Sequence, residues 1–142
     1  MTETKRRKSE VAAPGPVPTE VGEALRAAQS KQASDIVLLD LRGTGAFTDH
    51  FVICSARNRR QAKAIADAVQ ESLRASGGRR PMVEGYARGD WILLDCFDFV
   101  IHVFTPDMRA FYDLERLWGG AVRMAIDDPA AEVRRPPRPT RS

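Results

Sequence analysis

The most regular pattern of apolar and polar positions lies in the stretch DWILLDCFDFVIHVF, where two apolar runs are joined by a short polar segment. Two such runs at this spacing predict a β-hairpin. If Phe97 and Asp98 form a two-residue loop, Leu93 faces His102 across the hairpin. A three-residue loop would place Ile101 opposite Leu93 and move His102 to the other face. Phe97 leaves this choice open, because a two-residue loop requires a positive φ that bulky residues resist.

With the two-residue loop, alternation along each strand gives the hairpin two different faces. One face is wholly apolar and suited to a core: Ile92, Leu94, Cys96, Phe99, Ile101 and Val103. The other face is rich in aromatic residues and carries the polar groups: Trp91, Leu93, Asp95, Val100, His102 and Phe104. A large apolar area with a few polar side chains is typical of a partner site. We therefore predict a docking face centred on Trp91, with Asp95 diagonally near His102.

The rest of the chain predicts alternating helices and strands. Helices are expected over about 19–32, from 58 to the Gly77-Gly78 pair, and from 105 to about 118; further strands are expected at 36–39, 51–54 and 81–84. Asn58 with Gln61 three residues later predicts the start of the second helix. The order α-β-β-α-β-β-β-α indicates an α/β (α+β) fold, a single mixed sheet of about five strands packed with about three helices.

Composition divides the chain into one domain, 19–125, and two tails, 1–18 and 126–142, which are rich in proline and basic residues. Such tails bury too little apolar area to offset the entropy of ordering, so we expect them to be disordered. The net charge is +3, but residues 20–128 hold 14 basic and 16 acidic side chains, so the folded part is not basic. The basic tails either contact RNA phosphates or remain solvated.

The cysteine and hydropathy patterns favour a cytoplasmic, soluble protein without a membrane or export segment. Cys54 and Cys96 lie apart in strand-like runs, as buried thiols of a reducing compartment do. No stretch of roughly 18 uninterrupted apolar residues is present. The two histidines and two cysteines are each alone in their segments, so neither a metal site nor a cofactor is predicted.

Acidic residues around the hairpin raise the possibility of metal-assisted phosphoryl transfer. Asp95 and Asp98 bracket the loop, but neither Asp90 nor Asp95 begins the Asp-x-Asp spacing that such enzymes use. Turn formation explains these acids more simply, and we predict no catalytic residue. A nucleotidyl or phosphoryl-transfer enzyme remains the alternative hypothesis.

A basic cluster stands at the start of the second predicted helix. Arg57, Arg59, Arg60 and Lys63 place positive charge where the helix dipole is also positive. This indicates either a waiting anion such as an RNA phosphate, or exposed charges that salt screens. A general RNA-binding adaptor is therefore a further hypothesis.

Several motifs in a fixed order resemble the ribosomal silencing factor (Iojap) family. They are TDHFVICS at 48–55, WILLD at 91–95, HVF at 102–104 and FYDLERLW at 111–118. The resemblance runs from about Asp35 to Trp118, which is nearly the whole predicted domain. In the family a small residue, often Gly, is usual where Phe97 stands.

This resemblance implies a translation repressor without enzymatic activity. It implies docking on the large ribosomal subunit through ribosomal protein L-fourteen and a block on joining of the small subunit, which also points to negative regulation of ribosome biogenesis. The implied fold is similar to nucleotidyl transferases without their catalytic acids. The hairpin face and the family motifs together give the expected partner-binding residues: Asp49, Trp91, Leu93, Asp95, His102, Arg109 and Tyr112. Off the ribosome a monomer or homodimer is expected.

Overall fold

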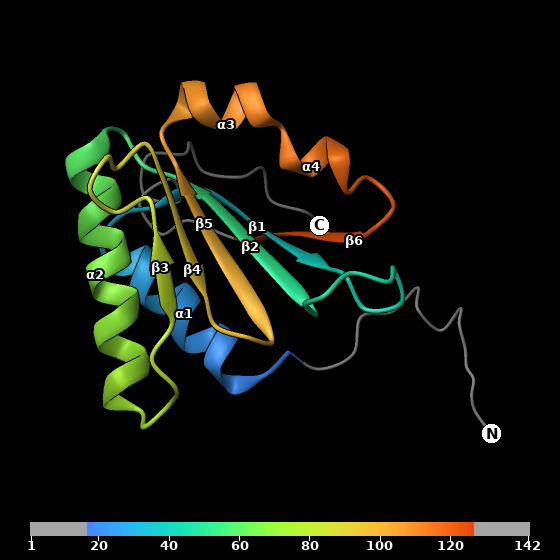
Figure 1. Ribbon diagram of the computed structural model, residues 1–142, viewed down its shortest axis with the longest axis horizontal. Coiled ribbons are helices and arrows are strands. Elements are labelled where there is room, and N and C mark those ends of the chain that lie inside the picture. The colour runs from blue at the N-terminus through green and yellow to red at the C-terminus, as the bar shows by residue number, and fades with distance from the viewer. Residues whose placement is uncertain (1–16, 127–142) are drawn as a thin grey trace, which may run out of the picture.

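Six strands form one mixed sheet in the order β3-β4-β5-β2-β1-β6 (Figure 1). The computed structural model describes residues 17–126. The strands are β1 Ser34–Asp40, β2 His50–Ser55, β3 Met82–Glu84, β4 Trp91–Asp95, β5 Phe99–Phe104 and β6 Val122–Ile126. The helices are α1 Thr19–Ser30, α2 Arg59–Ala75, α3 Pro106–Tyr112 and α4 Leu114–Leu117. The predicted mixed α+β fold is confirmed, with one strand more than expected.

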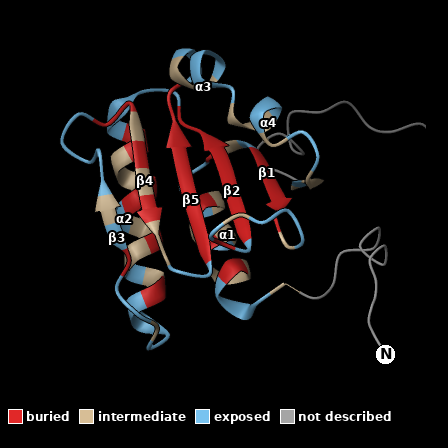
Figure 2. Cartoon of the chain, turned by 45° about the vertical axis from the view of Figure 1, so that its right-hand side comes forward, coloured by how far each residue is buried: buried red, intermediate tan, exposed pale blue. Residues whose placement is uncertain are grey.

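The helices are distributed unequally over the two faces of the sheet. α1 and α2 lie over one face, whereas α3 and α4 lie across one end of the other face (Figures 1 and 2). β2 and β5 are parallel, and the other neighbouring strands are antiparallel. α2 follows β2 and α3 follows β5, so the two helices leave the ends of parallel strands toward opposite faces. Such an arrangement creates a crevice at the ends of the strands.

The face under α1 and α2 buries the larger apolar core. α2 contributes Ala62, Ile65, Ala66, Val69 and Leu73, the stripe expected from its sequence spacing. The predicted core face of the hairpin is confirmed, since Ile92, Leu94, Phe99, Ile101 and Val103 are buried in the same cluster. Burying a side chain of the size of Ile65 contributes about 1.5–3 kcal/mol, so this layer is a main source of stability.

The start of α2 is fixed by the predicted capping residues. The side chain of Asn58 accepts a hydrogen bond from the backbone N–H of Gln61 at 2.8 Å. The amide of Gln61 also donates to the backbone carbonyls of Lys31 and Gln32, just after α1. Asn58 thus caps α2, and the side chain of Gln61 ties the start of α2 to the end of α1.

The hairpin has the register expected for a two-residue loop. The N–H of Cys96 donates to the carbonyl of Phe99 at 2.9 Å, and Leu93 lies opposite His102. Of the two alternatives left open by the sequence, the two-residue loop is therefore the observed one. His102 lies on the same face as Trp91, because residues at alternate positions and their cross-strand partners share a face.

The structure differs from the sequence prediction at three places near the C-terminal end. Val122–Ile126 forms a sixth strand, which pairs antiparallel with β1. Its last residue, Ile126, extends the sheet one position into the predicted C-terminal tail; the predicted tails otherwise lie almost wholly outside the described residues. The helix predicted from 105 to 118 breaks at Asp113, whose φ is +50°. A single helix there is therefore wrong, and α3 and α4 form an angled pair (Figure 1).

Candidate functional site

Trp91 contacts two aromatic rings at the end of the sheet where α3 crosses. The ring of Phe104, its partner across the hairpin, stacks on Trp91 at a centroid distance of 5.0 Å. Tyr112 from α3 contacts the indole at 4.5 Å. Trp91 stays partly exposed, whereas Phe104 is fully buried. The indole is therefore presented at the surface in a fixed position.

His102 supports the same indole from inside the sheet. Its Nδ1 accepts a hydrogen bond from the Nε1–H of Trp91 at 3.1 Å. The ring is only 3% exposed, and Phe51 meets it edge-on at 4.6 Å. Burial lowers the pKa of His102 to about 4, so the ring is neutral at pH 7. A neutral ring that accepts at Nδ1 carries its proton on Nε2.

Asp95 lies diagonally from His102 on the same face, as expected, but it is not the hydrogen-bond partner of His102. The carboxylate of Asp95 instead accepts from the backbone N–H of Phe97 at 2.9 Å, within the hairpin turn. The partner of His102 is the indole of Trp91. Asp95 thus acts as a turn residue at the far end of β4, while its carboxylate stays partly exposed.

Only the β4 half of the predicted docking face is accessible. Val100, His102 and Phe104 on β5 are buried, mainly within a second apolar cluster that includes Trp118 and Met108. Figure 2 shows the same contrast between the buried central strands and the more exposed β3 edge. What remains accessible is here called the Trp91 surface: Met82, Glu84, Trp91, Leu93, Asp95 and Tyr112.

The sequence did not identify Met82 and Glu84 as members of this surface. The register pairs Met82 with Asp95 and Glu84 with Leu93, which places both on the face of Trp91. Both are exposed, Met82 to 58%. A strand was expected at these positions, but its place beside β4 requires knowledge of the strand order. The result is an apolar centre with two carboxylates at its edge.

Arg109 lies mostly inside the protein, where it ties α3 to the sheet. Its guanidinium donates to the backbone carbonyl of Asp35 at 2.7 Å and to the hydroxyl of Ser55 at 2.8 Å. It also forms a two-point ion pair with Glu115 at 2.8 and 3.1 Å. The hydrogen bond from Arg109 lowers the pKa of Glu115. The geometry therefore gives Arg109 a supporting position beneath the surface rather than an exposed one.

Asp49 is not brought together with Trp91. It stands just before β2, and its N–H donates to the carbonyl of Asp98 at the hairpin loop. Trp91 lies at the other end of the same hairpin, opposite Phe104. Asp49 is exposed, but it belongs to the end of the sheet away from α3.

Three of the four predicted RNA-contacting residues line a hollow at the α3 end. Arg57, Arg59 and Arg60 border a cavity of about 490 Å³, together with Asn58, Asp90, Thr105, Pro106 and Asp107. This arginine hollow lies where β2 and β5 end and α2 and α3 begin. Lys63 points elsewhere, with its Nζ 5.8 Å from the centre of the Tyr86 ring.

The carboxylate of Asp90 moderates the charge of the arginine hollow. It accepts from Arg88 at 2.9 Å, and Arg59 lies 4.0 Å away. The three guanidinium-bearing residues of the hollow are all exposed. They can therefore meet an external anion, with Arg59 at the same time within ion-pair distance of the mostly buried Asp90.

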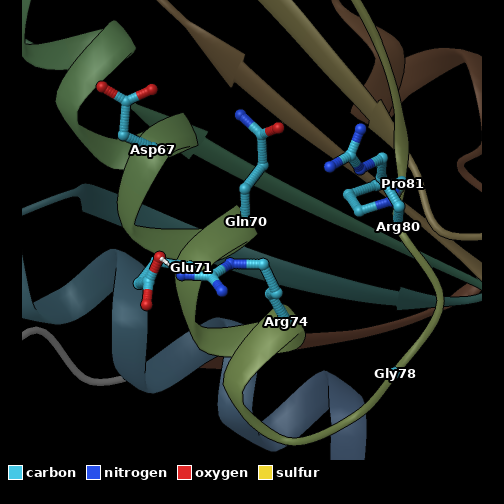
Figure 3. Close-up of a pocket in the computed structure, with 7 residues that line it drawn as sticks. All are labelled: Asp67, Gln70, Glu71, Arg74, Gly78, Arg80 and Pro81. Carbon is cyan, nitrogen blue, oxygen red and sulfur yellow. Dashed lines mark hydrogen bonds and ion pairs between the residues drawn. The ribbon is translucent and has the colours of Figure 1, made fainter.

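A cleft on the outer side of α2 lacks a comparable arrangement. It measures about 470 Å³ and is lined by Asp67, Gln70, Glu71, Arg74, Gly78, Arg80 and Pro81 (Figure 3). Glu71 and Arg74 pair with each other at 2.6 Å, and Asp67 accepts from the hydroxyl of Tyr86. Its charges are thus of both signs and largely partnered. Across residues 17–126, no three His, Cys, Asp or Glu side chains gather as a metal site would require, and no helix has the length and apolarity to span a membrane.

Comparison with known proteins gives one consistent result. The family model described as ribosomal silencing factor during starvation matches residues 14–142. Ribosomal silencing factors from Halalkalibacterium halodurans and Bacillus subtilis are each 36% identical over 104 residues, covering 73% of this chain and 89% and 88% of those proteins. A crystal structure of a protein from Chromobacterium violaceum superposes with a TM-score of 0.70 at 31% identity, covering 74% of this chain and 88% of that one. The resemblance predicted from the motifs is confirmed.

Proposed function

Because the chain belongs to the ribosomal silencing factor family, we propose that it binds the large ribosomal subunit through ribosomal protein L-fourteen and blocks association with the small subunit. The names of its relatives point to a regulatory factor of the ribosome rather than to an enzyme. The proposed place of action is the cytoplasm, and the proposed effect is repression of translation.

The Trp91 surface is the observation that carries this proposal. Partly exposed tryptophans with rigid surroundings are frequent energetic centres of protein interfaces. Here the rings of Phe104 and Tyr112 both contact the indole, so little side-chain entropy remains to be lost on binding. Leu93 and Met82 extend the apolar centre, and the acids at its edge favour a partner with basic groups around an apolar patch.

The arginine hollow supports an additional contact with ribosomal RNA. Its three arginines lie at the same end of the sheet as Trp91, where α2 and α3 begin. Arginine binds phosphate oxygens through two parallel hydrogen bonds, which suits a nucleic-acid backbone. We propose that Arg57, Arg59 and Arg60 face ribosomal RNA while the Trp91 surface contacts protein, and that Lys63 contributes at most long-range attraction.

Replacing Trp91 by Ala tests the proposed interface. Loss of a central tryptophan commonly costs about 2 kcal/mol or more, so we expect affinity for purified large subunits to fall about 30-fold or more. Co-sedimentation at increasing subunit concentration measures the change. Far-ultraviolet circular dichroism and thermal unfolding establish whether the variant is folded.

Phe47→Ala is the matched control for this experiment. Phe47 is 78% exposed and lies in the loop before β2, outside the Trp91 surface. We expect this variant to bind as the unchanged protein does. Equal binding by folded Trp91→Ala would remove Trp91 from the interface.

Subunit joining in sucrose gradients then tests silencing itself: an unchanged yield of joined particles, at saturating protein, contradicts the proposed block.

A further inference from the structure

The indole of Trp91 has one polar atom, and that atom points into the protein. Its Nε1–H donates to Nδ1 of His102 at 3.1 Å. The indole ring itself contacts the rings of Phe104 and Tyr112. The bond therefore does more than satisfy a donor, because it selects which edge of the indole is turned inward and which is left for a partner.

His102 lies among apolar neighbours that favour its neutral form, in which Nδ1 can accept a hydrogen bond. Its register neighbours are Leu93 on β4 and Ile53 on β2, and the rings of Phe51 and Phe104 lie against it. Among the described residues, its Nε2 is buried and has no hydrogen-bond partner. No charged side chain contributes to the shift of the pKa of His102, which burial alone lowers. These surroundings keep Nδ1 unprotonated and ready to accept at neutral pH.

A buried polar atom without a partner is costly, and an apolar residue would avoid that cost. The orphaned Nε2 is therefore hard to explain if His102 only fills space between β4 and β2. The acceptor at Nδ1 is the feature that an aliphatic side chain could not supply.

We propose that His102 is a positioning residue for the docking site: its Nδ1 fixes the orientation of the Trp91 indole for the ribosomal partner, and His102 itself touches no partner. This inference rests on the proposed function for its consequence in binding. Its structural part, the orientation of the indole, stands apart from that function.

Two substitutions separate positioning from packing. His102→Leu keeps a similar volume and removes the acceptor. His102→Asn restores an acceptor, because its amide oxygen lies at the same position along the side chain as Nδ1. Trp91→Phe removes the N–H while keeping an aromatic ring, and it serves as the reference background.

The first measurement is exchange of the indole N–H of Trp91 with solvent, observed by NMR in protein labelled with ¹⁵N-tryptophan. Trp118→Phe identifies which of the two indole signals belongs to Trp91. We expect exchange to be at least tenfold faster in His102→Leu than in the unchanged protein, and close to the original rate in His102→Asn. An unchanged rate in His102→Leu would overturn the proposal. This outcome does not depend on ribosome binding.

The second measurement is affinity for purified large subunits. We expect His102→Leu to bind about tenfold more weakly and His102→Asn to stay within about threefold of the unchanged protein. In the Trp91→Phe background, His102→Leu should have no further effect, because the bond is already absent. An equal loss in both backgrounds would show a packing role and overturn positioning.

The two measurements also distinguish the two proposals from each other. If the unchanged protein does not bind large subunits, the proposed function fails and the exchange rates still decide whether His102 orients Trp91. If the unchanged protein binds and folded His102→Leu binds equally well, positioning fails and the proposed function stands. Should His102→Leu not fold, the exchange and affinity of His102→Asn decide: a rapidly exchanging indole with unchanged affinity rejects the proposal.

Discussion

Phe97 at the tip of the β4–β5 hairpin has a φ of +74°, a value that a bulky side chain adopts at a cost. The N–H of Asp98 donates to the carbonyl of Cys96 at 2.9 Å, which closes a γ-turn centred on Phe97 within the two-residue loop. The guanidinium of Arg79 lies 4.2 Å from the centre of the Phe97 ring and offsets part of the strain. This chain therefore combines a strained backbone with an added ring contact at the tip of the hairpin.

Two substitutions of Phe97 measure this strain. Both Phe97→Gly and Phe97→Ala lose the contact with Arg79, but only glycine adopts the positive φ freely. We expect the glycine variant to be about 1 kcal/mol more stable than the alanine variant in urea unfolding. Alanine equal to or better than glycine would show that the turn carries no backbone strain.

The histidines predict how stability responds to acid. Burial lowers the pKa of His102 to about 4, and burial also lowers the pKa of His50. Between the folded pKa of His102 and its unfolded value of about 6.5, the unfolded chain binds more protons, so stability falls as pH falls. We expect His102 to reduce the free energy of unfolding by on the order of 2 kcal/mol between pH 7.5 and 5. Urea unfolding at a series of pH values measures this slope.

His102→Asn is the control, since it removes the titrating group and keeps an acceptor. Its slope between pH 7.5 and 5 should be smaller than that of the unchanged protein, with the remainder from His50. Hydrogen bonds from arginine lower the pKa of Asp40 and of Glu115. Their stabilisation is present above the unfolded carboxyl pKa and is lost as pH falls through the folded pKa, at more acid pH. An identical slope in the variant would mean that His102 does not titrate in this range.

For single residues, the sequence predicts the face of the sheet on which a side chain lies better than its hydrogen-bond partner. For the two-residue loop, alternation placed His102 and Trp91 on one side of the hairpin, and the structure has that loop; the sequence alone left the loop length open. It could not choose between Asp95 and Trp91 as the partner of His102. That choice depends on the turn, where Asp95 bonds the backbone of Phe97, and on α3, which closes over the indole.

Arg109 is the residue through which α3 is attached to the sheet. Its substitution by Ala leaves Glu115 without its closest cation and leaves Ser55 and the carbonyl of Asp35 without a donor. We expect a loss of about 2–3 kcal/mol, because the guanidinium is mostly buried and breaking such a pair leaves a charge unpaired. Urea unfolding measures the loss of free energy of unfolding. Tryptophan fluorescence of the folded variant reports whether Tyr112 stays in contact with Trp91.

Arg116→Ala is the matched control on the adjacent helix α4. Its side chain is 78% exposed and lies 3.8 Å from Asp113. Exposed pairs of this kind contribute less than about 1 kcal/mol, so the stability should change little. Equal effects of the two substitutions would contradict a supporting role for Arg109.

Whole elements were predicted well where they are long and periodic, and poorly near the C-terminal end. The stripe of α2 and its Asn58 cap were sufficient to predict the helix within a residue or two. The sixth strand was missed although apolar residues alternate at Val122, Met124 and Ile126. Its short pattern merges into the basic tail, and it becomes a strand by pairing with β1. The break at Asp113 comes from its left-handed backbone, with a φ of +50°, which the spacing of apolar residues does not reveal.

At the scale of the whole molecule, one topological feature brings the two proposed contact regions together. β2 and β5 are parallel neighbours, and the helices that follow them, α2 and α3, pack on opposite faces of the sheet. The arginine hollow forms at their ends, and α3 also delivers Tyr112 to Trp91. This proximity could not be predicted from the sequence, because the arginines and Trp91 are separated by more than thirty positions and meet only through the strand order.

This proximity predicts two separable components of ribosome affinity. Contacts between arginine and phosphate release counterions, so each makes the fall of log affinity with log salt steeper by about 0.7–0.9, whereas an apolar contact leaves this steepness nearly unchanged. Replacing Arg57, Arg59 and Arg60 together by Ala should therefore reduce the slope by about 2. Co-sedimentation of the full chain with purified large subunits at several salt concentrations measures it.

The opposite behaviour is expected of Trp91→Ala, which should lower affinity at every salt concentration and keep the slope. Arg26 and Arg74, on the outer side of α1 and α2, provide an arginine control at another place, compared per charge removed. Their joint replacement by Ala removes two charges and should leave the slope nearly unchanged. If it lowers the slope as much per charge as the hollow variant does, net charge rather than the arginine hollow governs attraction. If neither set of arginines affects the slope, binding depends on the Trp91 surface and the ribosomal RNA contact is absent.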